Sequence, residues 1–312
     1  MVPVYYIGKR TLLDIMGSAV FWGALILAGI VCFMMLYIGW RSVQSGAGVE
    51  HPRDRGGHFR MDDQTDPDAS GGPDSNGFLG SSRFREPDPR DRLLWFVYVA
   101  TIGFTNLLGI FIMIGLLSRD IEDRRIDILL ARPVSRGQIY LGKLLGGWAS
   151  ILVFLAAITA WTVVCMFISG MGVQWKYLGA IAVGSISPLL IASLTLLMSL
   201  WMKGMLAGLI ATVATFSSST VGVALIYLMM IEVLKLNKVA YVVYRILPPL
   251  NVIGQNAIAH LHKDLYMRML LMTVQGNLPD KIGLYTHMWE VWVYFGVVVI
   301  LGWLSLFRRQ FT

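Results

Sequence analysis

Six long apolar runs constrain the fold of this chain more than any other feature of its sequence. They occupy residues 17–40, 93–117, 144–170, 178–202, 205–231 and 288–307. Each run reaches the roughly 20 residues that a helix needs to cross a hydrocarbon core of about 30 Å. Charged residues make up only 14% of the chain, whereas soluble domains contain about 25%. We therefore predict an all-α integral membrane protein with six transmembrane helices.

The central part of every run lacks Asp, Glu, Lys, Arg and His. The nearest acidic residues, Glu232 and Glu290, lie at the ends of runs. A charged group at mid-membrane costs about 2.5–3.5 kcal/mol or more and is usually kept for proton relay or voltage sensing. The pattern therefore argues against a proton-coupled transporter and a voltage-gated channel, and any transport must draw its energy from elsewhere.

An even number of spans places both termini on one side of the membrane. The short segments on that side carry five basic residues: Lys9, Arg10, Lys203, Arg308 and Arg309. The short connection on the other side carries Lys176. Because cytoplasmic segments are enriched in Lys and Arg, we predict cytoplasmic termini, an N-terminal interfacial helix over 1–16 and a multi-pass protein of the inner (cytoplasmic) membrane. This bias accounts for the net charge of +7, and no aromatic-interleaved basic patch points to nucleic acid.

Residues 41–92, on the opposite side, are rich in Asp, Gly, Ser and Pro. This composition is typical of a flexible, solvated loop. Asp66, Asp68 and Ser70 match the first half of a calcium-binding loop, but the twelfth position is Gly77, where such a loop needs a bidentate Glu. We therefore predict a hydrophilic outer loop and no calcium site.

Residues 232–287 mix apolar and polar residues at roughly helical spacing, with a break at Pro248 and Pro249. This pattern predicts one or two amphipathic helices at the outer interface of the membrane. His260 and His262 point about 200° apart on a helix, so they cannot both bind one metal ion there. The same segment contains thioethers that are more typical of packing or lipid contact than of metal binding: Met267, Met269 and Met272. No metal site is predicted.

Residues 137–144, GQIYLGKL, contain the G-x-x-x-x-G-K spacing of a nucleotide-binding P-loop. Leu144 stands where Ser or Thr must meet the magnesium ion, and the segment enters an apolar run instead of following a strand. All five histidines lie outside the apolar runs, and no G-x-S-x-G elbow occurs. We predict neither enzymatic activity nor a bound cofactor in this chain.

Small and hydroxyl side chains predict contacts between helices. Two G-x-x-x-G spacings, Gly142 with Gly146 and Gly204 with Gly208, permit close backbone approach. The fifth run contains a hydroxyl cluster: Thr215, Ser217, Ser218, Ser219 and Thr220. These hydroxyls can bond to their own i−4 carbonyls, or they can line a transport pathway or a helix contact. Both alternatives stay open at this point.

A dense charged segment, residues 118–143, separates the second and third runs. Residues 118–131 contain neither Gly nor Pro, and we predict a short helix there. Pro133 ends it, because proline disfavours helical geometry at the preceding residue. Ser135 and Gln138 form a capping-box pattern, which predicts a second helix that continues into the third run. Two helices hinged on one proline indicate a rigid element with a contact outside the membrane.

The pattern D-I-E-x-R…L-L-x-R-P-V-S-R…L-G-K, between Asp120 and Lys143, resembles the signature of ABC-2 type permeases. The closest branch is that of the multi-copper-enzyme-maturation or nitrous-oxide-reductase-type permease components. The resemblance implies that this segment is the coupling helix that docks on a separate ATPase subunit. The implied docking residues are Asp120, Glu122, Asp127, Arg132, Pro133, Val134, Ser135 and Arg136.

By the same resemblance, the chain is the membrane-spanning subunit of an ABC exporter embedded in lipid. It would pair with itself or a related permease, and with two ATPase subunits that bind ATP and Mg. The alternative is a subunit that passes ATP-driven force through 41–92 and 232–287 to an extracytoplasmic partner, without a transport pathway. Substitutions within 217–220 would separate the two, since loss of export with intact ATPase activity supports a pathway.

Overall fold

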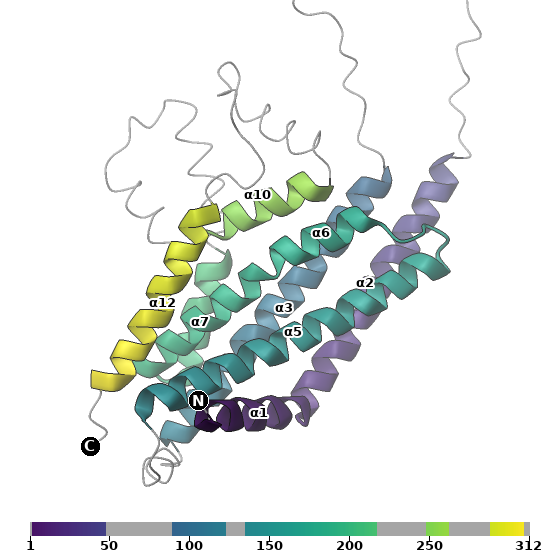
Figure 1. Ribbon diagram of the computed structural model, residues 1–312. Helices are drawn as coiled ribbons and strands as arrows, with labels where there is room; N and C mark the ends of the chain where they lie inside the picture. The colour runs from purple at the N-terminus through teal and green to yellow at the C-terminus, as the bar shows by residue number, and fades with distance from the viewer. Residues whose placement is uncertain (1, 48–88, 123–134, 217–247, 262–287, 309–312) are drawn as a thin grey trace, which may run out of the picture.

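The computed structural model describes residues 2–47, 89–122, 135–216, 248–261 and 288–308. Within these residues all regular secondary structure is helical. Six of the described helices run alongside one another as a bundle: α2 (Ala19–Ala47), α3 (Pro89–Glu122), α5 (Arg136–Ile168), α6 (Trp175–Gly184), α7 (Ile186–Trp201) and α12 (Met288–Arg308). At one end the bundle is crossed by α1 (Val2–Met16), and at the other by α10 (Leu250–Leu261) (Figure 1). The all-α prediction is confirmed for this part of the chain.

Five described segments are long and apolar enough to cross a membrane: Ala19–Arg41, Leu93–Leu116, Arg136–Ile168, Trp175–Trp201 and Met288–Leu306. A shorter apolar helix, Gly204–Phe216, occupies the start of the predicted span 205–231. The remainder of that span lies outside the described residues, as do most of the predicted outer segments 41–92 and 232–287.

The predicted span 178–202 corresponds to two helices, α6 and α7, that meet at Ser185. Pro188 lies three residues further on, and its ring nitrogen has no hydrogen to donate to the Gly184 carbonyl. The Ser185 hydroxyl instead donates to the Ala182 carbonyl at 2.7 Å. A missing ladder bond is a common cause of helix kinks, so the sequence itself accounts for this break.

A turn joins α5 to α6 at the end of the bundle away from α1 (Figure 1). Gly170 and Gly172 adopt φ angles of 74° and 68° there. Glycine reaches this left-handed region without the steric cost that a Cβ atom imposes. The two glycines therefore allow the chain to reverse direction between two long apolar helices.

Several buried hydroxyl groups in the described part of the bundle form hydrogen bonds within the protein. Thr105 and Thr195 donate to the carbonyls four residues earlier, at 2.7 and 2.8 Å. Thr101 of α3 also lies 3.1 Å from the Tyr177 hydroxyl of α6, and 3.8 Å from the Cys32 Sγ of α2. Because unsatisfied polar groups are costly in hydrocarbon, these bonds allow polar side chains inside the bundle and join three helices.

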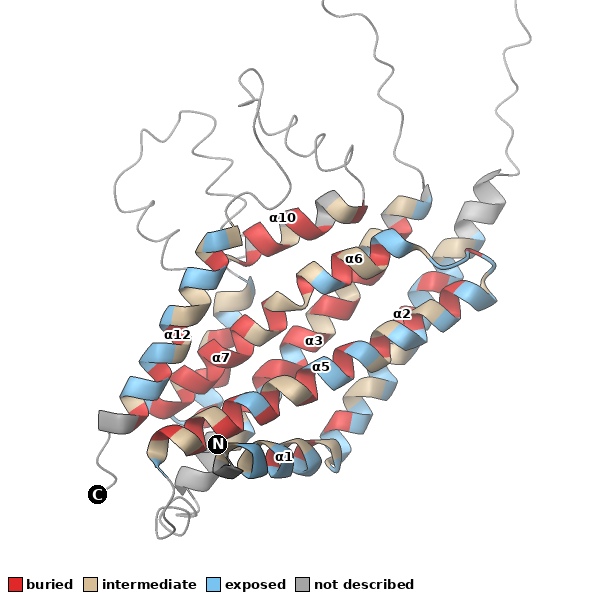
Figure 2. Ribbon diagram, in the orientation of Figure 1, coloured by how far each residue is buried: buried red, intermediate tan, exposed pale blue. Residues whose placement is uncertain are grey.

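The helix α10 begins directly after Pro248 and Pro249, as the predicted break requires. Leu250, Ile253, Ala257 and Leu261 are all buried and recur at spacings of three and four residues, which places them on one helix face. The described part of 232–287 thus contains a helix, α10, whose buried residues pack on the bundle, as Figure 2 shows.

Candidate functional site

The start of α5 forms the capping box that the sequence predicts. The Ser135 Oγ accepts a hydrogen bond from the Gln138 amide at 3.3 Å, and the Gln138 Oε1 accepts one from the Ser135 amide at 3.0 Å. These bonds satisfy donors that a helix N-terminus otherwise leaves open. The helix then continues for 33 residues to Ile168. One unbroken helix thus leads from residues 123–134, the connection between α3 and α5, through the bundle.

Gly142 and Gly146 bring α5 into close contact with α1. A Cβ atom on Gly146 would lie 2.6 Å from the Gly8 carbonyl oxygen and 2.7 Å from the Thr11 Cβ. A Cβ atom on Gly142 would lie 2.8 Å from the Ile7 Cβ. All three distances are far below van der Waals contact, so only glycine fits at these positions. The predicted close backbone approach is confirmed, and its partner is the N-terminal helix.

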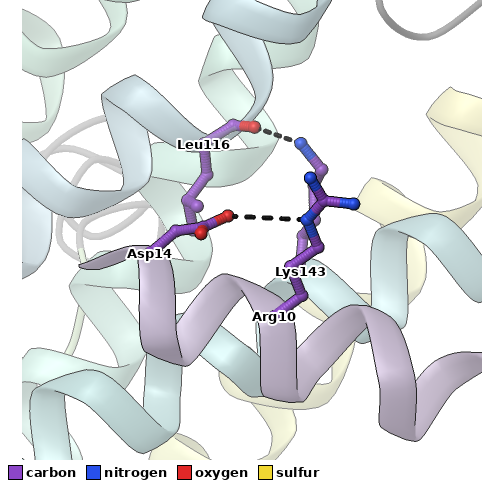
Figure 3. A network of polar contacts seen from close by, with 4 residues as sticks. All are labelled: Arg10, Asp14, Leu116 and Lys143. Carbon is purple, nitrogen blue, oxygen red and sulfur yellow. Dashed lines mark hydrogen bonds and ion pairs between the residues drawn. The ribbon is translucent and has the colours of Figure 1, made fainter. Parts of the chain in front are cut away.

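Lys143 joins α5 to the end of α3. Its side chain is only 6% exposed, and its Nζ donates a hydrogen bond to the Leu116 carbonyl oxygen (Figure 3). Gly147, one turn further along α5, lies against the side chains of Met113 and Leu116. The two helices that flank residues 123–134 are therefore held together by a polar bond and a close glycine contact.

An ion pair on α1 lies next to this bond. The Arg10 Nε and Asp14 Oδ2 atoms are 3.9 Å apart, and the two side chains are 84% and 74% exposed (Figure 3). Exposed ion pairs of this kind contribute little to stability. Lys143 is thus buried, whereas Arg10 and Asp14 are exposed, although the three side chains lie in the same region (Figure 3).

The first turns of α5 also contact α12. The Trp303 indole lies where a Cβ atom on Gly137 would point, and the Tyr140 ring and hydroxyl lie directly against Gly302. Tyr140 is fully buried. Within Gly137–Gly147, roughly three helical turns, α5 therefore contacts α1, α3 and α12. We name these eleven residues the α5 junction.

Half of the predicted docking residues lie on the two stems of the connection. Asp120 and Glu122 belong to the last turn of α3, and Ser135 and Arg136 begin α5. The bond between Lys143 and Leu116 shows that these stems are neighbours. The other four predicted residues lie outside the described part of the chain: Asp127, Arg132, Pro133 and Val134.

The predicted hydroxyl cluster is described only at its first member. Thr215 donates from its Oγ1 to the Ala211 carbonyl at 2.7 Å, which is the local bond that hydroxyls form within helices. The remaining members lie outside the described residues: Ser217, Ser218, Ser219 and Thr220. In the second predicted glycine pair, Gly204 with Gly208, Gly208 lies against the Ile114 side chain of α3.

Lys143 is the residue at this site that the sequence does not reveal. It lies one position before the apolar run 144–170, so a hydropathy reading leaves it outside the membrane. The structure includes it in the apolar segment Arg136–Ile168 and buries it.

No group of three or more His, Cys, Asp or Glu side chains in the described residues could hold a metal ion. The geometry is that of close packing between α5 and three other helices.

The sequence model of a family described as ABC-2 family transporter protein matches residues 7–275. This match covers well over half of the 312 residues. The chain belongs to the ABC-2 transporter family. No curated protein matches this ABC-2 family chain. The resemblance seen between Asp120 and Lys143 is confirmed at the level of the family.

The family match includes the whole α5 junction, but not the contacting helix α12. It begins within α1 and extends past α10. Together with five apolar helices, it identifies this ABC-2 chain as a multi-pass membrane protein and a permease component of transport. A transport component of this kind is consistent with the prediction that the chain is not itself an enzyme.

Proposed function

We propose that this chain is the membrane-spanning permease subunit of an ABC exporter, driven by ATP hydrolysis in a separate ATPase subunit. The observation that carries the proposal is the α5 junction. Directly after residues 123–134, a capped helix contacts α1, α3 and α12 within its first turns. A displacement imposed on that connection therefore reaches three further helices through tightly packed backbone contacts.

The proposed complex contains two copies of the ATPase subunit and a second permease protomer. ATP and Mg bind to the ATPase subunits. These subunits dock on Asp120, Glu122, Asp127, Arg132, Pro133, Val134, Ser135 and Arg136. Six spans, including 205–231, and cytoplasmic termini in the inner membrane place the docking segment on the cytoplasmic side. Figure 1 supports this arrangement, because α1, the end of α3, the start of α5 and the end of α12 share one end of the bundle.

The substrate pathway is proposed to include the hydroxyl cluster from Thr215 to Thr220. The alternative for these hydroxyls is a local bond to the carbonyl four residues earlier, which Thr215 forms with Ala211.

The branch of the family that we favour is that of the multi-copper-enzyme-maturation or nitrous-oxide-reductase-type permeases, because of the motif between Asp120 and Lys143.

Co-purification tests the proposal. Detergent-solubilised wild type should retain an ATPase subunit, whereas the double charge reversal Asp127→Arg and Arg136→Glu should lose it. Lys176→Glu is the control, since Lys176 is exposed in the first turn of α6, and α6 begins at the end of the bundle away from α1. If wild type and Lys176→Glu retain no ATPase subunit, or if the double variant retains it fully, the proposed docking is wrong.

A further inference from the structure

The face of α1 that points away from α5 combines aromatic, aliphatic and basic side chains. Tyr5 and Tyr6 are each 66% exposed and Leu13 is 58% exposed. Lys9 and Arg10 are also exposed. The five residues follow the pattern i, i+1, i+4, i+5 and i+8, which defines one face of a helix. The opposite face, with Gly8 and Thr11, packs on α5.

This outward face lies near the ends of two apolar segments, those of α2 and α3. The helix α1 ends at Met16, and the apolar segment of α2 begins at Ala19. The contacts next to α1 on α5 and α3 involve Lys143 and Leu116, and Leu116 is the last residue of its apolar segment. The helix therefore lies where hydrocarbon gives way to lipid headgroups.

The chemistry of the face fits that boundary. Tyrosine rings are enriched at the level of the headgroups. A helix with apolar and basic residues on its free face lies in the interface plane, and its Lys and Arg side chains attract anionic lipids. Trp22, one turn into the apolar segment of α2, is 52% exposed and adds a third exposed aromatic ring near this boundary.

We propose that the outward face of α1 binds anionic lipid headgroups through Lys9 and Arg10, with Tyr5, Tyr6 and Leu13 seated at the hydrocarbon boundary. This inference does not depend on the proposed ATPase partner. Asp14 opposes it, because this carboxylate lies 3.9 Å from Arg10 and is itself 74% exposed. The charge of Asp14 should therefore weaken the attraction for an anionic headgroup without preventing it.

Equilibrium binding of labelled phosphatidylglycerol to the full-length protein in a non-ionic detergent tests this proposal, with labelled phosphatidylcholine as the neutral probe. Each basic residue near an anionic surface contributes roughly a five-fold gain in affinity. Lys9→Gln with Arg10→Gln should therefore weaken phosphatidylglycerol binding by about 25-fold. Asp14→Asn should strengthen it by roughly two- to five-fold. Lys176→Gln, at the far end of the bundle, should leave it unchanged.

All four side chains are exposed, so the variants should melt at the wild-type temperature, and this is measured first. Higher salt should weaken binding to the wild type, since exposed charges are screened. Equal affinity for the two lipids would overturn the proposal. So would unchanged phosphatidylglycerol binding by the double variant. If that variant instead lost a co-purifying protein while its lipid binding stayed intact, the face would be a protein contact and the proposal would again be wrong.

Discussion

Lys143 of α5 donates a hydrogen bond from its side-chain nitrogen to the backbone carbonyl oxygen of Leu116 in α3. The two residues are separated by 27 positions in sequence, and the connection between α3 and α5 lies between them. The bond joins a side chain of α5 to the backbone of α3, so it depends on how the two helices pack.

Substitution of Lys143 should separate the effects of its charge and its shape. Lys143→Met keeps an unbranched chain of similar size and removes the buried charge, so its free energy of unfolding should change by no more than about 1 kcal/mol. Lys143→Glu places a carboxylate against a carbonyl oxygen that cannot donate to it, and should lower stability by about 3–5 kcal/mol. Thermal unfolding in detergent measures both. Equal melting of the Glu variant and the wild type would contradict the observed burial.

The contact between α1 and α5 should not tolerate a methyl group at Gly146. Because the added Cβ would meet the backbone of Gly8, Gly146→Ala should destabilise the protein by about 1–3 kcal/mol. Gly115 in α3 is the matched control, since no atom lies within 4 Å of its Cβ position. Gly115→Ala should be neutral or stabilise by up to about 1 kcal/mol. Melting temperatures that move in the same direction for both variants would refute the contact.

The capping box should control the order of the first turn of α5. Ser135→Ala removes the acceptor for the Gln138 amide and should cost about 1 kcal/mol, which corresponds to roughly five-fold faster hydrogen exchange at residues 136–139. Ser135→Asp keeps an acceptor and should restore protection. Hydrogen exchange followed by mass spectrometry distinguishes these outcomes. Unchanged exchange in Ser135→Ala would mean that contacts with other helices, and not the cap, hold this turn.

The bond between Thr101 and Tyr177 should contribute less than the packing of the tyrosine ring. Tyr177→Phe removes one hydroxyl at 3.1 Å from Thr101 and should cost about 0.6 kcal/mol, with an upper limit of about 1.7. Tyr177→Ala leaves a cavity where a fully buried ring was and should cost about 3–5 kcal/mol. Unfolding of the two variants is compared under the same conditions. A Phe variant as unstable as the Ala variant would show that the hydroxyl dominates.

Local sequence signals predicted the parts of this site that depend on neighbouring residues. The capping box needs only Ser135 and Gln138, three positions apart, so its geometry follows from the backbone. The break before α10 follows in the same way from Pro248 and Pro249. The spacing of Gly142 and Gly146 indicated a close approach, but it could not identify α1 as the helix that fills the groove.

Long-range contacts account for what the sequence could not reveal. Hydropathy placed the start of the third span at residue 144, because Lys143 and Arg136 lower the local average. The capping box at Ser135, in contrast, correctly predicted that the helix itself begins before this run, and α5 starts at Arg136. The burial of Lys143 depends on α3, whose position is not encoded in the neighbouring residues.

The glycine contacts of α5 lie close to one end of a helix that is about 50 Å long. Gly142 lies about 9 Å from the start of α5 and about 39 Å from its end, at 1.5 Å per residue. A small rotation of α5 about Gly142 would therefore move its far end about four times as far as its capped start. Such a lever gains distance at the expense of force, and it would deliver that movement to the turn formed by Gly170 and Gly172.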